Sequence, residues 1–121
     1  NLTYVASWLQ YKRDQMEKII TVYQDSAGKT PYFDWLFDLK DHTIRYRIEA
    51  RIDRIRHGNY GDHKRFNNIV ELRLDFGKGY RVYFGEEGNT VVVLLIGGDK
   101  STQEKDIKKA LSYWEDYNEK E

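Results

Sequence analysis

The sequence predicts one small α+β domain, a mainly antiparallel sheet with helices packed on it. The first observation behind this fold class is the order of the periodic segments: one strand, two helices, three successive strands and a last helix. The second is bulk composition, because 121 residues with 40% hydrophobic and 33% charged side chains suit one globular domain with a modest core. The longest apolar run, residues 91–96, is too short to cross a bilayer. With no cysteine and no visible signal peptide, a cytoplasmic protein without a membrane partner is expected.

The N-terminal segment divides into an extension and a first strand. Tyr4, Trp8 and Leu9 fall near helical spacing within residues 3–16, which predicts a weak helix or an ordered extension. Residues 18–25 are β-branched and aromatic, which predicts a strand. We therefore expect an extension over residues 1–17 and the domain over residues 18–121.

Two helices should follow. Thr30 is a plausible N-cap and Pro31 suits the first helical position, so a short helix is predicted over residues 31–40. Its expected buried residues are Phe33, Leu36 and Phe37. The second helix, residues 42–57, ends at Gly58. One apolar stripe runs along it, made of Ile44, Ile48, Ile52 and Ile55, and Arg47, Arg51 and Arg54 line one side of that stripe. The segment 59–68 is rich in Gly, Asn and Asp, which predicts a loop.

The last part of the chain should contain three antiparallel strands and a helix. Residues 70–76 alternate apolar and charged side chains, which predicts a half-buried strand. After a glycine turn at 77–79, alternation resumes with Tyr80 and Val82 on one face and Arg81 and Tyr83 on the other. Residues 90–96 lack alternation, which predicts a central strand buried on both faces. Ser101 and Glu104 match a capping box for a helix whose expected buried stripe is Ile107, Ala110, Leu111 and Trp114.

The charge is balanced overall and uneven along the chain. Lys and Arg number 20, as do Asp and Glu, which argues mildly against a nucleic-acid binder. Residues 40–81, however, hold eleven Lys or Arg against six Asp or Glu, and all three histidines. One positive surface is therefore compatible with zero net charge.

Several common sites are absent from the sequence. The segment 96–102, IGGDKST, lacks the spacing of a phosphate-binding P-loop, and its Ser101 is better explained as a helix start. The histidines lack metal-ligand spacing, and there is no nucleophile elbow. No metal and no cofactor are therefore expected.

A cluster of cations remains. If the hairpin pairs as its pattern suggests, Arg73 and Arg81 share the non-core side of adjacent strands, and Lys100 reaches the edge of the same sheet. Lys64 and Arg65 enter from the preceding loop, and Tyr80 and Tyr83 add aromatic surface on opposite faces. Arginine forks bind phosphate oxygens and aromatic rings stack on unpaired bases, so such a groove suits single-stranded RNA. The alternative from the same residues is a cross-strand salt-bridge network with Glu71 and Asp75.

Four segments carry a resemblance to a known family: GKTPYFDWLFDLKD, GNYGDHK, ELRLDFGKGYRVYF and LLIGGDKSTQEKDIKKALSYWEDY. Together they resemble the phage-derived, HigB-like addiction-module killer proteins of the RelE/ParE toxin superfamily, over roughly residues 18–117. The resemblance implies a RelE/ParE-like fold and a type II toxin that cuts mRNA on the ribosome. It also implies a cognate antitoxin, with a helix-turn-helix DNA-binding part, as partner.

The resemblance also implies site residues. Arg81 and Lys100 fall where relatives keep cationic catalytic residues, Arg73 and Lys64 fall in the basic strand and loop that face RNA, and Asp106 falls at a catalytic position in the last helix. We count all five as catalytic candidates. The wider RNA-binding set comprises His63, Arg65, Tyr80, Tyr83, Arg47, Arg51 and Arg54.

A metal-free mechanism fits these residues. Attack by a 2′-hydroxyl needs a base, an acid and stabilisation of the extra phosphate charge. Lys64 or His63 could serve as base, Arg73 and Arg81 would hold the phosphate, and Lys100 would neutralise the leaving side.

The chain departs from the family in two respects. Its net charge is zero, and the segment 65–70 is shorter and lacks the usual glycine. Two other functions therefore stay open: a gyrase inhibitor, as in another branch of the superfamily, and a degenerate module that only binds an antitoxin.

Overall fold

The computed structural model of the chain describes residues 2–14 and 17–120. The elements follow one another as α1 (Leu2–Asp14), β1 (Ile19–Val22), α2 (Pro31–Asp38), α3 (His42–Arg56), β2 (His63–Phe66), β3 (Ile69–Leu74), β4 (Tyr80–Glu87), β5 (Val91–Gly98), the 3₁₀ turn η1 (Lys100–Thr102) and α4 (Gln103–Lys120). The α+β class predicted from the sequence is confirmed. None of the helices in the described part of the chain is long and apolar enough to cross a membrane.

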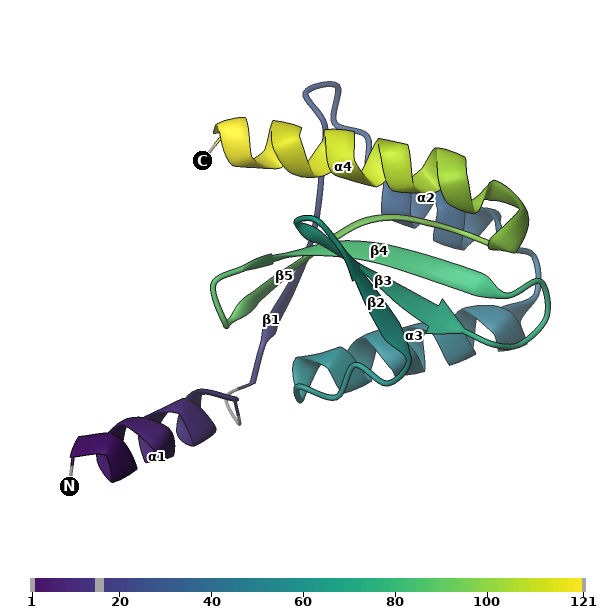
Figure 1. The fold of residues 1–121 in the computed structure, drawn as a ribbon. Helices are drawn as coiled ribbons and strands as arrows, with labels where there is room; N and C mark the ends of the chain where they lie inside the picture. The colour runs from purple at the N-terminus through teal and green to yellow at the C-terminus, as the bar shows by residue number, and fades with distance from the viewer. Residues whose placement is uncertain (1, 15–16, 121) are drawn as a thin grey trace.

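The sheet has the strand order β1-β5-β4-β3-β2. β1 runs parallel to β5, and the other neighbours are antiparallel. β5 therefore lies inside the sheet, and its residues 92–96 are buried, as the unbroken apolar run predicts. Figure 1 shows α4 above the sheet and α3 below it, while α1 projects away from the sheet and its helices.

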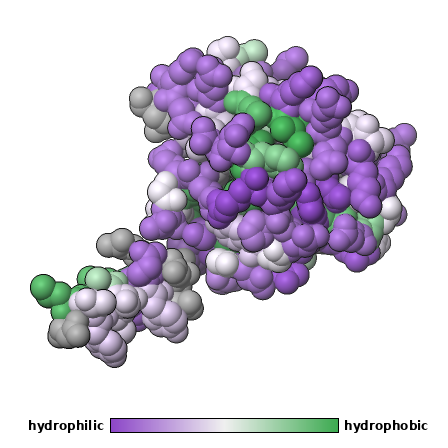
Figure 2. All heavy atoms as spheres, viewed as in Figure 1, coloured by the Kyte–Doolittle hydropathy of each residue, from purple (hydrophilic) through white to green (hydrophobic). Residues whose placement is uncertain are grey.

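Two apolar clusters fill the spaces between the sheet and its helices. The cluster under α2 and α3 includes Tyr32, Leu36, Ile48, Ile52, Ile55, Leu72, Val82 and Phe84. The cluster under α4 includes Tyr23, Tyr83, Val93, Leu95, Ala110 and Trp114. Figure 2 shows hydrophilic side chains over most of this side of the molecule, with a hydrophobic area by α4, smaller ones elsewhere, and hydrophobic atoms on α1. The prediction that the strand at 70–76 is half-buried is confirmed at Arg73 and Asp75, which are 31% and 67% exposed, and wrong at Glu71, which is fully buried.

The segment predicted as a loop at 59–68 contains the edge strand β2. Its residues pair with β3 from His63↔Leu72 to Phe66↔Ile69, joined by the two residues between them. One of these, Asn67, has φ +51, a left-handed conformation that asparagine tolerates better than most residues. Asparagine thus makes a tight turn without the glycine that the sequence lacks there. The signal for β2 was weak because three of its four side chains are charged or histidine and exposed.

The helices confirm some predicted core residues and correct others. Ile48, Ile52 and Ile55 of α3 are buried, and Ile44 is partly buried against them. In α2, Leu36 is buried as predicted, but Phe33 and Phe37 are 38% and 63% exposed. These two rings stack on each other on the outer side of the helix. Tyr32 and Leu36, four residues apart, face the sheet instead, and the phenylalanines lie one residue further round the helix.

The start of the last helix also differs from the prediction. Asp99, not Ser101, is the cap: its carboxylate accepts a hydrogen bond from the backbone N–H of Ser101 at 2.8 Å. The hydroxyl of Thr102 in turn accepts one from the backbone N–H of Asp99. The capping box is therefore Asp99 with Thr102, and it begins the turn η1 before α4. The α4 stripe itself is confirmed, with Ala110 and Trp114 buried and Ile107 and Leu111 partly buried.

Close packing on glycine brings helices near the sheet. A Cβ on Gly98 would lie 1.8 Å from an oxygen of Asp106, and one on Gly97 would lie 2.1 Å from the Trp35 ring. Only a residue without a side chain fits at either position. Gly98 pairs with Arg81 across β4 and β5, so this packing sets the first turn of α4 beside the predicted site.

Candidate nucleic-acid interface

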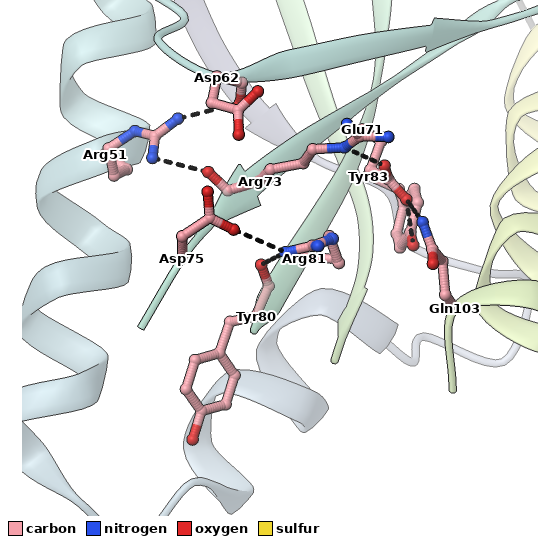
Figure 3. A network of polar contacts seen from close by, with 9 residues as sticks. All are labelled: Arg51, Asp62, Glu71, Arg73, Asp75, Tyr80, Arg81, Tyr83 and Gln103. Carbon is pink, nitrogen blue, oxygen red and sulfur yellow. Dashed lines mark hydrogen bonds and ion pairs between the residues drawn. The ribbon is translucent and has the colours of Figure 1, made fainter. Parts of the chain in front are cut away.

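Arg73 and Arg81 are direct neighbours across β3 and β4. The register pairs these two residues, so the prediction that both arginines lie on one side of the sheet is confirmed. Like charges at opposite positions destabilise a sheet unless other groups compensate. The arrangement therefore depends on the carboxylates around it, which Figure 3 shows.

Glu71 is the central carboxylate of this network. Its side chain is 0% exposed, and it accepts hydrogen bonds from Arg73 Nε at 2.9 Å, the Tyr83 hydroxyl at 2.8 Å and Gln103 Nε2 at 2.8 Å. The donors come from β3, β4 and α4, so the network joins the sheet to the helix above it. Burial raises the pKa of Glu71, but the three hydrogen bonds outweigh burial and hold this pKa below its usual value. The hydrogen bond between Arg73 Nε and Glu71 also raises the pKa of Arg73.

The lowered pKa of Glu71 predicts a loss of stability in acid. A carboxyl group with a depressed folded-state pKa stabilises the fold above its unfolded-state pKa, about 4.3. That stability is lost as pH falls through the lower, folded-state value. Urea unfolding between pH 7 and pH 3 should therefore show a falling free energy of unfolding, with a flatter dependence in Glu71→Gln. Glu86, Asp99 and Asp116, whose pKa values are also lowered, account for the pH dependence of stability that remains in this variant. Identical slopes in both proteins would contradict the assignment to Glu71.

Arg81 is buried, with its side chain only 7% exposed. Its Nη1 donates to the Tyr80 carbonyl at 3.1 Å and lies 3.8 Å from Asp75 Oδ1. Its Nε has no hydrogen-bond partner. The salt-bridge alternative with Glu71 and Asp75 is therefore present in part: Asp75 and Arg81 meet across the hairpin, whereas Glu71 and Arg73 pair within β3. The contact within β3 is a close hydrogen-bonded pair, and the contact across the hairpin is long and open to solvent.

The three α3 arginines of the predicted RNA-binding set have different surroundings. Arg51 holds neighbouring segments together. Its guanidinium donates hydrogen bonds to the backbone carbonyls of Arg73, Tyr60 and Asp62 at 2.8, 2.9 and 3.2 Å. Burial lowers the pKa of Arg51, as does its neighbour Arg54, against the opposing effect of Asp62 and Asp75. The guanidinium of Arg47 lies 3.7 Å from the centre of the Phe76 ring. These side chains border a cleft of about 360 Å³, lined by Arg47, Ala50, Arg51, Arg54, Asp75 and Phe76.

Lys64 and Lys100, predicted from the flanks of the hairpin, are exposed cations. Lys64 pairs with Glu71 across β2 and β3, so it shares the side of Arg73, and its ammonium lies 4.8 Å from the Phe66 ring centre. The methylenes of Lys100 pack over the turn glycine Gly79, within 2.8 Å of where a Cβ would stand. Both can therefore add charge at the border of the arginine pair.

His63 and Arg65 are held elsewhere. His63 Nδ1 lies 2.8 Å from the carbonyl of Gly61, so this nitrogen carries the proton because a carbonyl only accepts. Arg65 pairs with Glu86 at 2.5 Å, and its strand position faces the side of the sheet that α3 covers. Arg65 therefore lies on the opposite side of the sheet from Arg73 and Arg81.

The prediction that Tyr80 and Tyr83 add aromatic surface is wrong. Tyr80 is 5% and Tyr83 is 0% exposed, so neither adds aromatic surface for stacking on a base. Burial, and then the hydrogen bond to Glu71, raise the pKa of Tyr83. The Tyr83 hydroxyl thus acts as a structural donor.

Asp106 is buried at 4% exposure, against Gly98 and the Thr102 hydroxyl that donates to it. It belongs to the start of α4, next to the strand that pairs with Arg81. Sequence reasoning missed Gln103, which has no periodic or motif signal and reaches Glu71 only through the packing of α4. It also assigned no site role to Glu71 or Asp75, although their positions in the charged alternation of β3 singled them out as partners of the arginines.

Comparison with known proteins places the chain in a family without giving it an activity. It is 53% identical over 77 residues to an uncharacterized protein of Haemophilus influenzae, a match that covers 63% of this chain and 78% of that protein. No protein-family model matches the chain. At this identity and coverage, the chain belongs to the same family as the Haemophilus protein.

Proposed function

We propose that this chain, as a member of the family of that Haemophilus protein, is a toxin of a type II toxin–antitoxin system. Its activity would be metal-independent, ribosome-associated cleavage of mRNA in the cytoplasm. The proposal starts from the resemblance of its motifs to HigB-like proteins of the RelE/ParE superfamily, and the small α+β fold is compatible with it. The observation that carries it is the cross-strand pair of Arg73 and Arg81 beside the arginine-lined cleft of α3.

The chemistry follows from these positions. Arg81 is desolvated, and a guanidinium in a desolvated site stabilises developing phosphate charge far better than one in water. Arg73 is hydrogen-bonded to Glu71 through Nε alone, so the two outer nitrogens of its guanidinium are available to bind a phosphate oxygen. Lys64 would act as base and Lys100 on the leaving side, because both are exposed at the border of the pair. Asp106 is assigned to positioning the start of α4, since it is buried against Gly98.

The partners of this function would be mRNA on the ribosome and a cognate antitoxin with a helix-turn-helix DNA-binding part. The antitoxin would cover or displace elements around the basic face. A purified complex that leaves Arg73 as open as in this chain alone would instead indicate an indirect neutralisation.

A second candidate function has its own observation. Both arginines already have carboxylate neighbours within the chain, Glu71 for Arg73 and Asp75 for Arg81. Such internal pairing favours a non-catalytic member of the superfamily, either a gyrase inhibitor or a module that only binds an antitoxin. The long and exposed contact of Asp75 is the weak point of this alternative.

Induced expression with mapping of mRNA ends separates these functions. Wild-type protein should arrest growth and produce codon-phased mRNA cuts, while Arg81→Ala and Lys100→Ala should produce none. Growth arrest with intact mRNA and stalled replication would refute cleavage and favour the gyrase inhibitor. Absence of any arrest would favour the antitoxin-binding module.

A further inference from the structure

Asp75 is a carboxylate that lies among three arginines without a hydrogen bond from any of them. Its Oδ1 is 3.8 Å from Arg81 Nη1, outside hydrogen-bond range, and its side chain is 67% exposed. The charge of Asp75 also acts on two other arginines. It opposes the lowering of the Arg51 pKa by burial, and it adds to the raising of the Arg73 pKa by the hydrogen bond to Glu71. Figure 3 shows Asp75 between the Arg51 side of the network and Arg81.

The arginines around Asp75 have unused donors. The Nε atoms of Arg81 and Arg51 are both buried and have no partner. Arg73 uses Nε for Glu71, and its outer nitrogens make no hydrogen bond to any residue within 2–14 or 17–120. The two Nε atoms are closed to solvent, so a ligand reaches the outer nitrogens of the partly exposed Arg73, and acceptor oxygens placed there would be stabilised. Asp75 balances charge at this place without filling these donors.

We propose that Asp75 is an internal stand-in for an RNA phosphate, and that a bound strand displaces it from the three arginines. This inference rests on the proposed function, because it takes RNA as the ligand. A phosphate group carries acceptor oxygens in an arrangement that arginine forks bind bidentately, whereas Asp75 is tied to a backbone that keeps it 3.8 Å away. Because Asp75 is exposed and lies just after the end of β3, its side chain can turn into solvent when a phosphate enters.

The Asp75 carboxylate should also affect which polyanions the arginines bind. The carboxylate repels any polyanion that approaches the arginines, so a strand binds only if it supplies enough contacts to compensate. The cleft beside Asp75, lined by the α3 arginines, offers such contacts for neighbouring phosphates. Removal of the Asp75 charge should therefore strengthen binding of single-stranded RNA, which is opposite to the effect expected of a carboxylate that orders the site.

The test compares Asp75→Asn with Asp53→Asn. Both changes remove one negative charge from similarly exposed side chains, 67% and 65%, but Asp53 pairs with Arg56, outside the arginine cluster. The probe is a labelled, 2′-O-methylated single-stranded RNA of about ten nucleotides, which cannot be cut by 2′-hydroxyl attack. Fluorescence anisotropy at one fixed salt concentration should show roughly fivefold tighter binding for Asp75→Asn and less than twofold change for Asp53→Asn. Equal affinities of the two variants, or weaker binding by Asp75→Asn, would overturn the proposal.

A second measurement does not depend on RNA cleavage. The Arg81 Nε–Hε resonance should shift when inorganic pyrophosphate is added, and at lower concentration in Asp75→Asn than in wild type. A shift without mRNA cleavage in cells would support the phosphate site and refute the proposed nuclease. Cleavage without any response at Arg81 would overturn the stand-in role and leave the nuclease intact. Asp75→Ser repeats both measurements, so that a folding defect in one variant does not remove the test.

Discussion

Replacement of Glu71 by alanine should lower the free energy of unfolding by about 3 kcal/mol, the largest stability loss expected for a polar residue among those that the structure describes. Glu71 is 0% exposed and accepts three hydrogen bonds. Alanine would leave the Tyr83 hydroxyl without its acceptor in the core, and Arg73, opposite Arg81, without its hydrogen-bonded carboxylate. The arginine cost is reduced because Arg73 is 31% exposed and keeps part of its hydration. Urea denaturation at pH 7 measures the loss.

Two variants make this result interpretable. Glu104→Ala changes an exposed glutamate near the start of α4 and should alter stability by less than about 0.5 kcal/mol. Glu71→Gln keeps the size of the side chain and one acceptor oxygen, so it should fall between wild type and alanine. A loss below about 1 kcal/mol for Glu71→Ala would mean that the network contributes little to the fold.

Replacement of Arg81 by lysine should reduce mRNA cleavage by about a hundredfold or more, if the proposed function is right. Lysine keeps the positive charge but offers a single ammonium in place of the planar fork, so it cannot bind a phosphate bidentately. Arg81 is the candidate with the largest expected effect because its side chain is nearly fully buried, where one fixed donor counts most. Cleavage by purified protein on programmed ribosomes measures the loss.

The control for this experiment is Arg56→Lys. Arg56 lies at the end of α3, is 46% exposed and pairs with Asp53, outside every candidate set. It should keep full cleavage activity. Thermal unfolding of Arg81→Lys separates a chemical effect from a folding defect, because a folded but inactive variant is the expected outcome. Wild-type cleavage by a folded Arg81→Lys protein would remove Arg81 from the mechanism.

The alternation in residues 70–84 was enough to predict part of the candidate site. Side chains in a strand alternate between the two faces with a period of two, so the pattern predicts which residues share a side once the hairpin register is set. Arg73 and Arg81 do pair directly, and the unbroken run at 91–96 does form an inner strand. The isoleucine stripe of α3 follows in the same way from helical periodicity.

The surroundings of those side chains could not be read from the same pattern. Alternation shows that Glu71 and Arg81 lie opposite the core of α3, but burial depends on whether another element covers that second face. α4 covers it from more than thirty residues away in sequence, and Gln103 completes the Glu71 network from there. Tyr83 becomes buried for the same reason, which is why it offers no aromatic surface.

The sequence by itself determined most of the elements, although not β2, and the relative sides of the residues in α3 and in the hairpin of β3 and β4, since helix and strand periods are local properties of the chain. Only the tertiary structure decided which sides meet solvent, which carboxylate is buried and which is exposed, and how Arg51 is held at the hairpin. These outcomes depend on contacts between segments that are distant in sequence. In such contacts the cost of burying a charge is offset by hydrogen-bond or ion-pair partners, which a local sequence pattern does not contain. The contrast between Glu71, held by three donors, and Asp75, held by none, is the product of that packing.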